Sequence, residues 1–224
     1  MTKDFKNNRI KEIAKYIRPY KKIADVGCDH GYLIVEAFKN HEIDYAIAID
    51  NKQGPLDSAK YNILKYGFNN NVRFSLSSGI SDIDDDTEVV IIAGMGGLLI
   101  NQIIKDDIDK LMNVKRLVIE ANRNQYDCRK YLSSIGYYIS DEEIVLENNK
   151  FYQIIIFEKN NELINNYSEQ ELLYGPILLK ERKPLFIEML KDEYNKLLSI
   201  NNHQNIENVY NKIKLLKGII NDED

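Results

Sequence analysis

The sequence predicts an α/β protein with a doubly wound, mainly parallel sheet, an antiparallel hairpin at the edge of that sheet, and a small C-terminal α-helical hairpin. Three observations predict this fold class. Short apolar runs alternate with amphipathic helical patterns up to about residue 135, which is typical of βαβ units. Residues 139–157 then alternate apolar and polar side chains around a turn, as a β-hairpin does. From residue 168 onward the apolar residues recur at helical spacing.

The elements follow in order from these patterns. A basic helix is predicted over residues 1–20, because Ile10, Ile13, Ala14 and Ile17 form an apolar stripe. Apolar, β-branched runs predict parallel strands at residues 23–26, 45–49, 72–76, 89–93 and 116–120. Helical patterns follow at residues 31–39, 55–66, 98–105 and 125–135, and the hairpin strands are residues 139–146 and 151–157. Right-handed crossovers between the parallel strands give a sheet that is covered on both faces.

The C-terminal segment is predicted to form a separate helical unit. A polar connector at residues 160–167 precedes it, and Ser168 and Glu171 have the spacing of a capping box. Two apolar stripes, within residues 186–197 and 206–220, flank a polar loop at residues 201–205 and predict two antiparallel helices with a coiled-coil-like seam. We therefore predict two domains, residues 1–160 and residues 161–224. Two helices alone bury little apolar surface, so we expect them to pack on the sheet domain or to bind a partner.

Composition excludes several classes of protein. The chain has 224 residues and a net charge of −5, which argues against a uniformly basic nucleic-acid binder. The charge is uneven, however, because the first 22 residues hold eight Lys or Arg and two acids. No signal peptide and no apolar run of roughly 18 residues is seen, so we expect a cytoplasmic protein that does not enter the membrane. Two separate cysteines and three scattered histidines predict no metal site, and no obligate protein partner is evident.

The loop after the first strand carries the strongest chemical signal. It reads Asp25-Val26-Gly27-Cys28-Asp29-His30-Gly31-Tyr32, and its two glycines allow close approach to a ligand. The dinucleotide pattern G-x-G-x-x-G is absent, since Asp29 stands where the second glycine would be. An acid there would repel a pyrophosphate. The loop instead suits a ligand with a cationic or amino end, such as S-adenosyl-L-methionine.

The loops after the next three strands complete a candidate ligand site. Asp50, with Asn51 beside it, is placed to accept hydrogen bonds from two ribose hydroxyls. Ser78 and Gly79 are placed to meet an adenine edge, and the run Ala93-Gly94-Met95-Gly96-Gly97 predicts a close approach of backbone to ligand. Ligands of doubly wound sheets bind beyond the carboxyl ends of the strands, which is where all four loops are expected.

These motifs resemble one family, the bacterial tRNA (adenine(22)-N(1))-methyltransferases, which are Rossmann-like class I S-adenosylmethionine enzymes with a C-terminal coiled-coil domain. The resemblance is carried by D-x-G-x-D-H-x-Y from Asp25 and by A-G-M-G-G from Ala93, with Tyr174-Gly175-Pro176 in the helical region. Two segments depart from it. Ser77-Ser78 replaces the family's Gly-Asp or Gly-Asn, and Glu120-Ala121-Asn122 replaces Gln-Pro-Asn. Only Asn122 is kept, so no role for Glu120 is supported.

The resemblance implies methylation of N1 of adenine 22 in the D-loop region of tRNA, with S-adenosyl-L-methionine as cofactor. Asp29 and His30 are the candidate catalytic residues, because they are the ionisable groups within the glycine loops. Asp29 would be an electrostatic or base group and His30 would orient cofactor or substrate. The alternative is that Asp29 only binds the methionine amine and His30 is structural. The implied cofactor-binding residues are Asp25, Gly27, Cys28, Asp29, Gly31, Tyr32, Asp50, Asn51, Ser78, Gly79, Ala93, Gly94, Met95 and Gly96.

Candidate tRNA contacts are basic residues and the glycine loop. They are Arg9, Lys11, Lys15, Arg18, Gly96, Gly97, Asn122 and Arg123, with Lys115, Arg116, Arg129 and Lys130 as further phosphate contacts. Three other functions stay open: a methyltransferase for a protein or small molecule, a nicotinamide oxidoreductase, which the missing glycines disfavour, and a non-catalytic RNA-binding adaptor.

Overall fold

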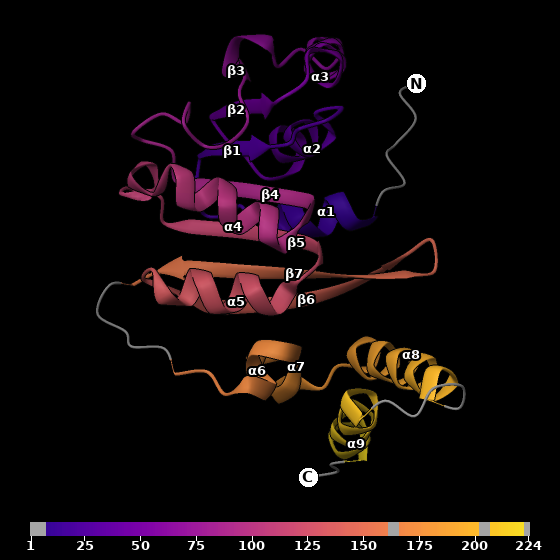
Figure 1. The fold of residues 1–224 in the computed structure, drawn as a ribbon. Helices are drawn as coiled ribbons and strands as arrows, with labels where there is room; N and C mark the ends of the chain where they lie inside the picture. Colours follow the sequence, from indigo (N-terminus) through magenta and orange to yellow (C-terminus); the bar gives the residue numbers. More distant parts are fainter. Residues whose placement is uncertain (1–7, 161–165, 202–206, 222–224) are drawn as a thin grey trace.

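The computed structural model describes residues 8–160, 166–201 and 207–221, and it contains one seven-stranded sheet (Figure 1). The strand order is β3-β2-β1-β4-β5-β7-β6. The strands are β1 (Lys22–Val26), β2 (Tyr45–Asp50), β3 (Val72–Leu76), β4 (Val89–Gly96), β5 (Arg116–Arg123), β6 (Tyr137–Glu147) and β7 (Lys150–Lys159). The first five strands are parallel, and β7 pairs antiparallel with both β5 and β6. The predicted α/β class, with its antiparallel edge hairpin, is confirmed.

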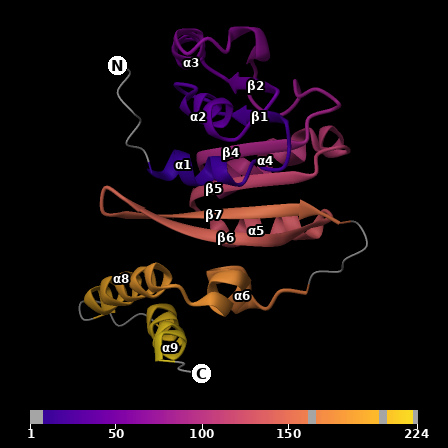
Figure 2. The ribbon, with the colours of Figure 1, turned by 180° about the vertical axis from the view of Figure 1, so that it is seen from behind.

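Helices cover both faces of the sheet (Figures 1 and 2). The helices of this part are α1 (Asn8–Lys15), α2 (Tyr32–Asn40), α3 (Gln53–Lys65), α4 (Gly97–Asp106) and α5 (Gln125–Ser134), with short 3-10 turns η1 (Asn69–Asn71) and η2 (Ile108–Leu111). One buried cluster joins α1, α2 and α3 to one face, and a second joins α4 and α5 to the other. Neighbouring strand residues such as Ile23 and Ala24 enter opposite clusters, which explains why the central strands read as unbroken apolar runs.

The chain reverses direction across the sheet between β1 and β4. From β1 it proceeds outward through β2 and β3, then returns to β4 on the other side of β1. We call the side of the sheet where the parallel strands end the carboxyl edge, and the side where they begin the amino edge. The chain segments that follow β1 and β4 diverge at the carboxyl edge and leave a crevice there. The pairing of β4 with β5 shifts register between Ala93 and Met95 and extends both strands beyond the predicted ends. The extension was missed because glycine and polar side chains end the apolar runs, although the backbone continues to pair.

The C-terminal part is helical, as predicted, and packs below edge strand β6 (Figure 1). It contains α6 (Glu169–Tyr174), α7 (Pro176–Glu181), α8 (Pro184–Asn201) and α9 (Glu207–Asn221). The predicted capping box at the start of α6 is present, with Ser168 accepting from the Glu171 backbone N–H. A buried cluster holds Phe186, Leu190 and Leu216 against Ile144 of β6. The separate helices α6 and α7 were not predicted as such.

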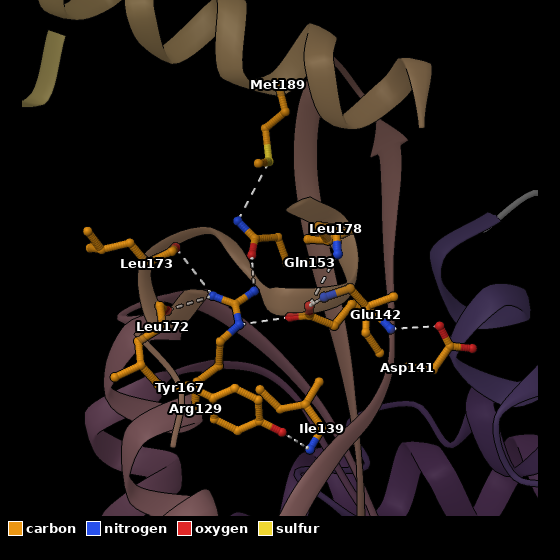
Figure 3. Close-up of polar contacts among 11 residues, drawn as sticks. Arg129, Ile139, Asp141, Glu142, Gln153, Tyr167, Leu172, Leu173, Leu178 and Met189 are labelled. Atoms are coloured by element: carbon orange, nitrogen blue, oxygen red, sulfur yellow. Dashed lines mark hydrogen bonds and ion pairs between the residues drawn. The ribbon is translucent and has the colours of Figure 1, made fainter. Parts of the chain in front are cut away.

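Arg129 of α5 and Glu142 of β6 form a fully buried ion pair that holds α6 and α7 to the sheet (Figure 3). Arg129 Nε donates to Glu142 Oε1 at 2.8 Å, and Arg129 Nη1 donates to the Leu172 carbonyl at 3.1 Å, near the end of α6. Glu142 Oε2 accepts from the Ile177 N–H at 3.0 Å in the first turn of α7. The prediction that Arg129 contacts RNA phosphate is therefore wrong, because its guanidinium is enclosed and paired.

Some predicted features lie outside the described residues. These are the first seven residues of the basic helix, most of the polar connector, and residues 202–205 of the loop before α9. The division into two domains at residue 160 and the coiled-coil seam stay predictions. Among the described residues no helix is long and apolar enough to cross a membrane.

Candidate active site

A cavity of about 510 Å³ lies at the carboxyl edge of the sheet, where the chain reverses direction. This volume falls within the range of roughly 300–1,000 Å³ that small-molecule sites occupy. The carboxyl ends of β1, β2 and β4, with the loops after β1, β2 and β3, supply most of its wall, and Arg9, Ile10 and Ile13 of α1 close one side. The four loops that the sequence pointed to thus meet in one place.

The β1 loop folds tightly around three residues in the left-handed region, Gly27, Asp29 and Gly31. Gly27 has φ +79°, and a Cβ there would collide with the end of the Met95 side chain, so glycine lets the two loops touch. The N–H groups of Gly27 and Cys28 donate to the Ile49 carbonyl at 2.8 and 2.9 Å. Gly31 lies outside the cavity wall and serves packing, since its missing side chain lets α2 begin close to Ala59 of α3.

Asp50 is held by backbone groups from the loops on both sides. Its Oδ2 accepts from the Asp29 N–H at 3.3 Å, and its Oδ1 accepts from the Lys52 N–H at 2.9 Å. Each carboxylate oxygen has further lone pairs for a second donor. Asp50 is buried at the end of β2 and lines the cavity, so two vicinal hydroxyls can reach it.

Asp25 is a second buried acid, at the back of the cavity. Burial, together with repulsion from Asp50 and Asp29, raises the pKa of Asp25 to about 7. Burial also raises the pKa of the neighbouring Cys28 thiol, which keeps it protonated. The site thus concentrates negative charge that a cationic ligand would stabilise.

Asp29 and His30 lie at the mouth of the cavity rather than at its back. Their side chains are 70% and 51% exposed, and His30 Nε2 is 3.7 Å from Asp29 Oδ1. Asp29 itself has φ +46°, an uncommon conformation for a non-glycine residue. The His30 ring lies 5.5 Å from the Tyr32 ring, which also lines the cavity. Both candidate catalytic groups can therefore meet a substrate that enters from solvent.

The third loop contributes hydroxyl groups. Ser77 and Ser78 line the cavity, and the Ser77 N–H donates to the Asp50 carbonyl at 3.0 Å. Gly79 is not in the wall, because it packs beside Ile103 of α4. The serine pair that replaces the usual Gly-Asp or Gly-Asn thus still presents polar atoms to the site.

Glu120 and Asn122 hold the glycine-rich segment at the end of β4 (the glycine loop, residues 93–97) from two sides. Glu120 Oε2 accepts from the Gly94 N–H at 3.0 Å, and the Asn122 amide donates to the Gly94 carbonyl at 2.5 Å. Gly94 has φ +80° and lines the cavity, as do Ala93 and Met95. The sequence supported no role for Glu120, but in the structure this fully buried carboxylate holds Gly94 in the cavity wall.

The same Glu120 oxygen also holds α1. Arg9 Nη1 donates to Glu120 Oε2 at 2.7 Å, and the Arg9 guanidinium stacks 4.6 Å from the centre of the Tyr152 ring. Arg9 Nε and Glu120 Oε1 are buried without a hydrogen-bond partner among the described residues. Burial raises the pKa of Glu120, while Arg9 opposes that rise. Arg9 thus joins the N-terminal helix to the glycine loop.

Several predicted RNA contacts lie away from the cavity. Lys15 pairs with Glu12, while Arg18 donates to the Asn40 carbonyl near the amino edge of the sheet. Lys115 and Arg116, at the start of β5, pair with Glu88 and Glu158. Lys11, Gly96, Asn122, Arg123 and Lys130 also lie outside the cavity wall.

Gly97 is buried against the turn between β5 and α5, where a Cβ would collide with the Asn124 carbonyl and Cys128. It has no surface for RNA, so that expectation is corrected. Sequence reasoning missed Lys52 and Pro55 in the cavity wall, for which the only signal was their position just after Asp50. No group of three or more His, Cys, Asp or Glu that could hold a metal is found in the described part of the chain.

Comparison with known proteins gives one consistent result. Residues 23–223 match the family described as tRNA (adenine(22)-N(1))-methyltransferase. A Bacillus subtilis (strain 168) protein of that name is 30% identical over 229 aligned residues, which cover 96% of each chain.

Solved structures agree with this result. A Streptococcus pneumoniae protein in complex with S-adenosyl-L-methionine has a TM-score of 0.88 and 31% identity, covering 95% of this chain and 98% of its own. M. capricolum TrmK, solved with S-adenosyl-homocysteine, has a TM-score of 0.82 and 28% identity, covering 95% of this chain and 96% of its own. With the match over nearly its whole length, and with the sheet order and site loops described above, this chain belongs to the tRNA (adenine(22)-N(1))-methyltransferase family.

Proposed function

We propose that this chain transfers the methyl group of S-adenosyl-L-methionine to N1 of adenine 22 in the D-loop region of tRNA, within the cytoplasm. The observation that carries the proposal is the cavity at the carboxyl edge, in which two buried acids, exposed Asp29 and the Gly94 loop converge. Family membership supplies the substrate and the position of the methylated base.

The cofactor fits the polarity of the cavity. Asp50 would accept from both ribose hydroxyls, and the acids of the β1 loop would face the ammonium and sulfonium charges. Ser77 and Ser78 would meet the adenine edge. The proposed cofactor-binding residues that line the cavity are Asp25, Gly27, Cys28, Asp29, Tyr32, Asp50, Asn51, Ser78, Ala93, Gly94 and Met95. Gly31, Gly79 and Gly96 would act through the shape of their loops.

The reaction needs positioning more than activation. The N1 lone pair of adenine attacks the methyl carbon, the bond from carbon to sulfur breaks, and sulfur keeps the electron pair as S-adenosylhomocysteine forms. The enzyme must hold nitrogen, carbon and sulfur in line. In folded tRNA this edge of the base is hidden, so the adenine must be flipped out into the cavity. The methylated ring carries a positive charge until a proton leaves N6.

Asp29 is proposed as the group that stabilises this charge or takes the N6 proton, and His30 as the group that orients it. Exposure at the cavity mouth supports this assignment, since Asp25 and Asp50 lie deeper. If Asp29 instead only binds the methionine amine, Asp29→Asn will raise the KM of S-adenosyl-L-methionine and leave kcat near wild type. If it stabilises the reacting base, kcat will fall and KM will change little.

The decisive experiment uses methyl-labelled S-adenosyl-L-methionine and an unmodified tRNA transcript with adenine at position 22. We expect 1-methyladenosine at position 22, mapped by mass spectrometry of nuclease fragments. A matched transcript with guanine at position 22 should receive no label. No transfer to any tRNA with adenine 22, or transfer only to a protein or small molecule, would overturn the proposal.

A further inference from the structure

A second groove opens beside the cofactor cavity, along helix α3. It has a volume of about 450 Å³ and is lined by His30, Tyr32, Asp57, Ser58, Tyr61 and Asn62. We call it the α3 groove. His30 and Tyr32 also line the cofactor cavity, so the two hollows share one wall. The α3 groove therefore adjoins the cofactor cavity on the side of His30 and Tyr32.

One side of helix α3 forms most of the groove wall. Asp57 and Tyr61 are four residues apart, as are Ser58 and Asn62, so all four lie on one side of the helix. The opposite side buries Leu56, Ala59 and Ile63 in the core and thereby fixes the rotation of α3. The Asn62 amide donates to the His30 carbonyl at 3.0 Å, which ties the β1 loop to the groove.

Three aromatic rings face this groove. Tyr61 is 68% exposed, and the His30 and Tyr32 rings lie 5.5 Å apart with a tilt of 31°. A single exposed tyrosine is ordinary on a protein surface, as Tyr210 of α9 illustrates at 57%. Three rings lining one groove beside the proposed reaction site are different, because an exposed aromatic face can receive a nucleobase by stacking.

The acidic residues at the groove indicate which class of ligand it can bind. Asp57 is in its wall, and Asp29 of the cofactor cavity directly precedes His30 of the shared wall, so a phosphate would be repelled there. A nucleobase has no charge, two flat faces, and ring or amino donors that carboxylates accept. The groove therefore suits the base of a nucleotide rather than its phosphate.

We propose that the α3 groove holds an unpaired base of tRNA adjacent to the methylated adenine, stacked on Tyr61. This inference rests on the proposed function and names a contact within it. Flipping an adenine out of a folded RNA leaves its neighbours without a stacking partner, and an aromatic side chain at the cavity mouth replaces that partner. The contact favours the flipped state without touching the cofactor.

The first test measures tRNA binding with Tyr61→Ala, Tyr61→Phe and the control Tyr210→Ala, each in the presence of S-adenosylhomocysteine. We expect the Kd of tRNA to rise about 5- to 140-fold for Tyr61→Ala, the range that loss of one base stack produces. Tyr61→Phe keeps the ring and should stay within about twofold of wild type, as should Tyr210→Ala. S-adenosylhomocysteine affinity should be unchanged in all three, since Tyr61 is outside the cofactor cavity.

The second test uses the absence of tryptophan from the chain. Tyr61→Trp introduces a single tryptophan in the groove, and Tyr210→Trp introduces one on α9 as the control. A base stacked on the ring should quench the fluorescence of the Tyr61→Trp protein when the tRNA transcript is added. The Tyr210→Trp protein should show little change.

Two results would overturn the inference: wild-type tRNA affinity for Tyr61→Ala, or equal quenching of the two tryptophan variants. The proposed function fails by a different result, in which the wild-type protein binds tRNA but transfers no methyl group. Both groove tests read binding alone and still decide the stacking contact in that case. The two failures are therefore distinguishable.

Discussion

Asp25 is predicted to couple cofactor binding to pH, because its pKa is raised to about 7 in the folded protein. Ionising this carboxyl in the empty cavity costs free energy, so its contribution to folding stability falls as pH rises from about 4 to about 7 and stays constant above that range. A cationic cofactor favours the ionised form and lowers the pKa again. Binding must then release a proton, and S-adenosyl-L-methionine should bind more tightly as pH rises from about 6 to 8, by at most tenfold per pH unit.

Isothermal titration calorimetry in buffers of different ionisation enthalpy measures this proton release directly. Asp25→Asn is the matched variant, because its amide has nearly the same shape and does not titrate in this range. We expect it to bind with an affinity that is nearly independent of pH. An unchanged wild-type affinity between pH 6 and 8 would contradict the role of Asp25.

Glu120 is predicted to act through its hydrogen bonds to Arg9 and Gly94. Glu120→Gln keeps an acceptor oxygen and the side-chain volume, so we expect a loss of unfolding free energy below about 1 kcal/mol. Glu120→Ala removes every acceptor and leaves Arg9 partly buried without its main partner. Its unfolding free energy should fall by about 3 kcal/mol, the low end of the range for a broken buried pair, because Arg9 is 24% exposed.

Urea denaturation of the two variants checks this prediction, and methyl transfer reports the position of the Gly94 loop. We expect low transfer for Glu120→Ala and nearly normal transfer for Glu120→Gln. Equal stability of the two variants would show that Glu120 does not organise the loop through hydrogen bonding.

Residue roles were predictable where the motif itself carries the chemistry. Asp25, Asp50 and Gly94 could be placed because each follows an apolar strand, and strand ends meet at one edge. Glu120 could not, because Arg9 lies 111 residues earlier in the chain. Nothing in the local sequence tells a buried, paired carboxylate from an exposed one.

At the scale of elements, one ion pair serves two helix ends. Arg129 meets carbonyls at the end of α6, and Glu142 meets N–H groups at the start of α7 (Figure 3). Each charge thus also offsets the dipole of its helix end. Gly175 joins the helices at φ +93°, and a Cβ there would collide with the Glu142 carboxylate. The turn between α6 and α7 is therefore shaped by a residue of the sheet.

Arg129→Met is predicted to loosen α6 and α7 from the sheet. It leaves the Glu142 charge buried without a counterion, so unfolding free energy should fall by about 3–5 kcal/mol. Lys130→Met is the matched control, because Lys130 is the next residue of α5 and is exposed. It should change stability by less than about 0.5 kcal/mol.

Hydrogen exchange should show where the Arg129→Met protein loosens. We expect faster exchange in residues 169–181, while the core strands β1 and β4 keep their protection. Exchange that rises evenly over the whole chain would mean that the pair supports the entire fold rather than this attachment.

The strands and the helices of the sheet region followed from periodicity, because each buries a continuous apolar face. The break between α6 and α7 depends on Glu142, which is distant in sequence, and so it was not predicted. The sequence Tyr174-Gly175-Pro176 does hold a turn signal, yet only the fold explains why the chain turns there.

For the whole molecule, the question is which face meets RNA. The net charge is −5, and the charged residues are spread unevenly along the sequence. At the amino edge of the sheet, Lys115 and Arg116 are paired with acids, and Arg18 is bound to a carbonyl. At the carboxyl edge, exposed Arg123 lies beside Gly96, and exposed Lys150 lies over the Tyr152 ring, as Arg9 does. We therefore expect the carboxyl edge to carry the phosphate contacts.

The salt dependence of tRNA binding tests this expectation. Each phosphate contact adds roughly one unit to the slope of log Kd against log salt, so Arg123→Ala and Lys150→Ala should each reduce that slope by about 1. Arg18→Ala is the matched control, since it removes one exposed cation at the opposite edge. Its slope should equal that of wild type. A smaller slope for Arg18→Ala, together with an unchanged slope for Lys150→Ala, would contradict this expectation. It would indicate that RNA binds at the amino edge, where it could not place an adenine in the cavity.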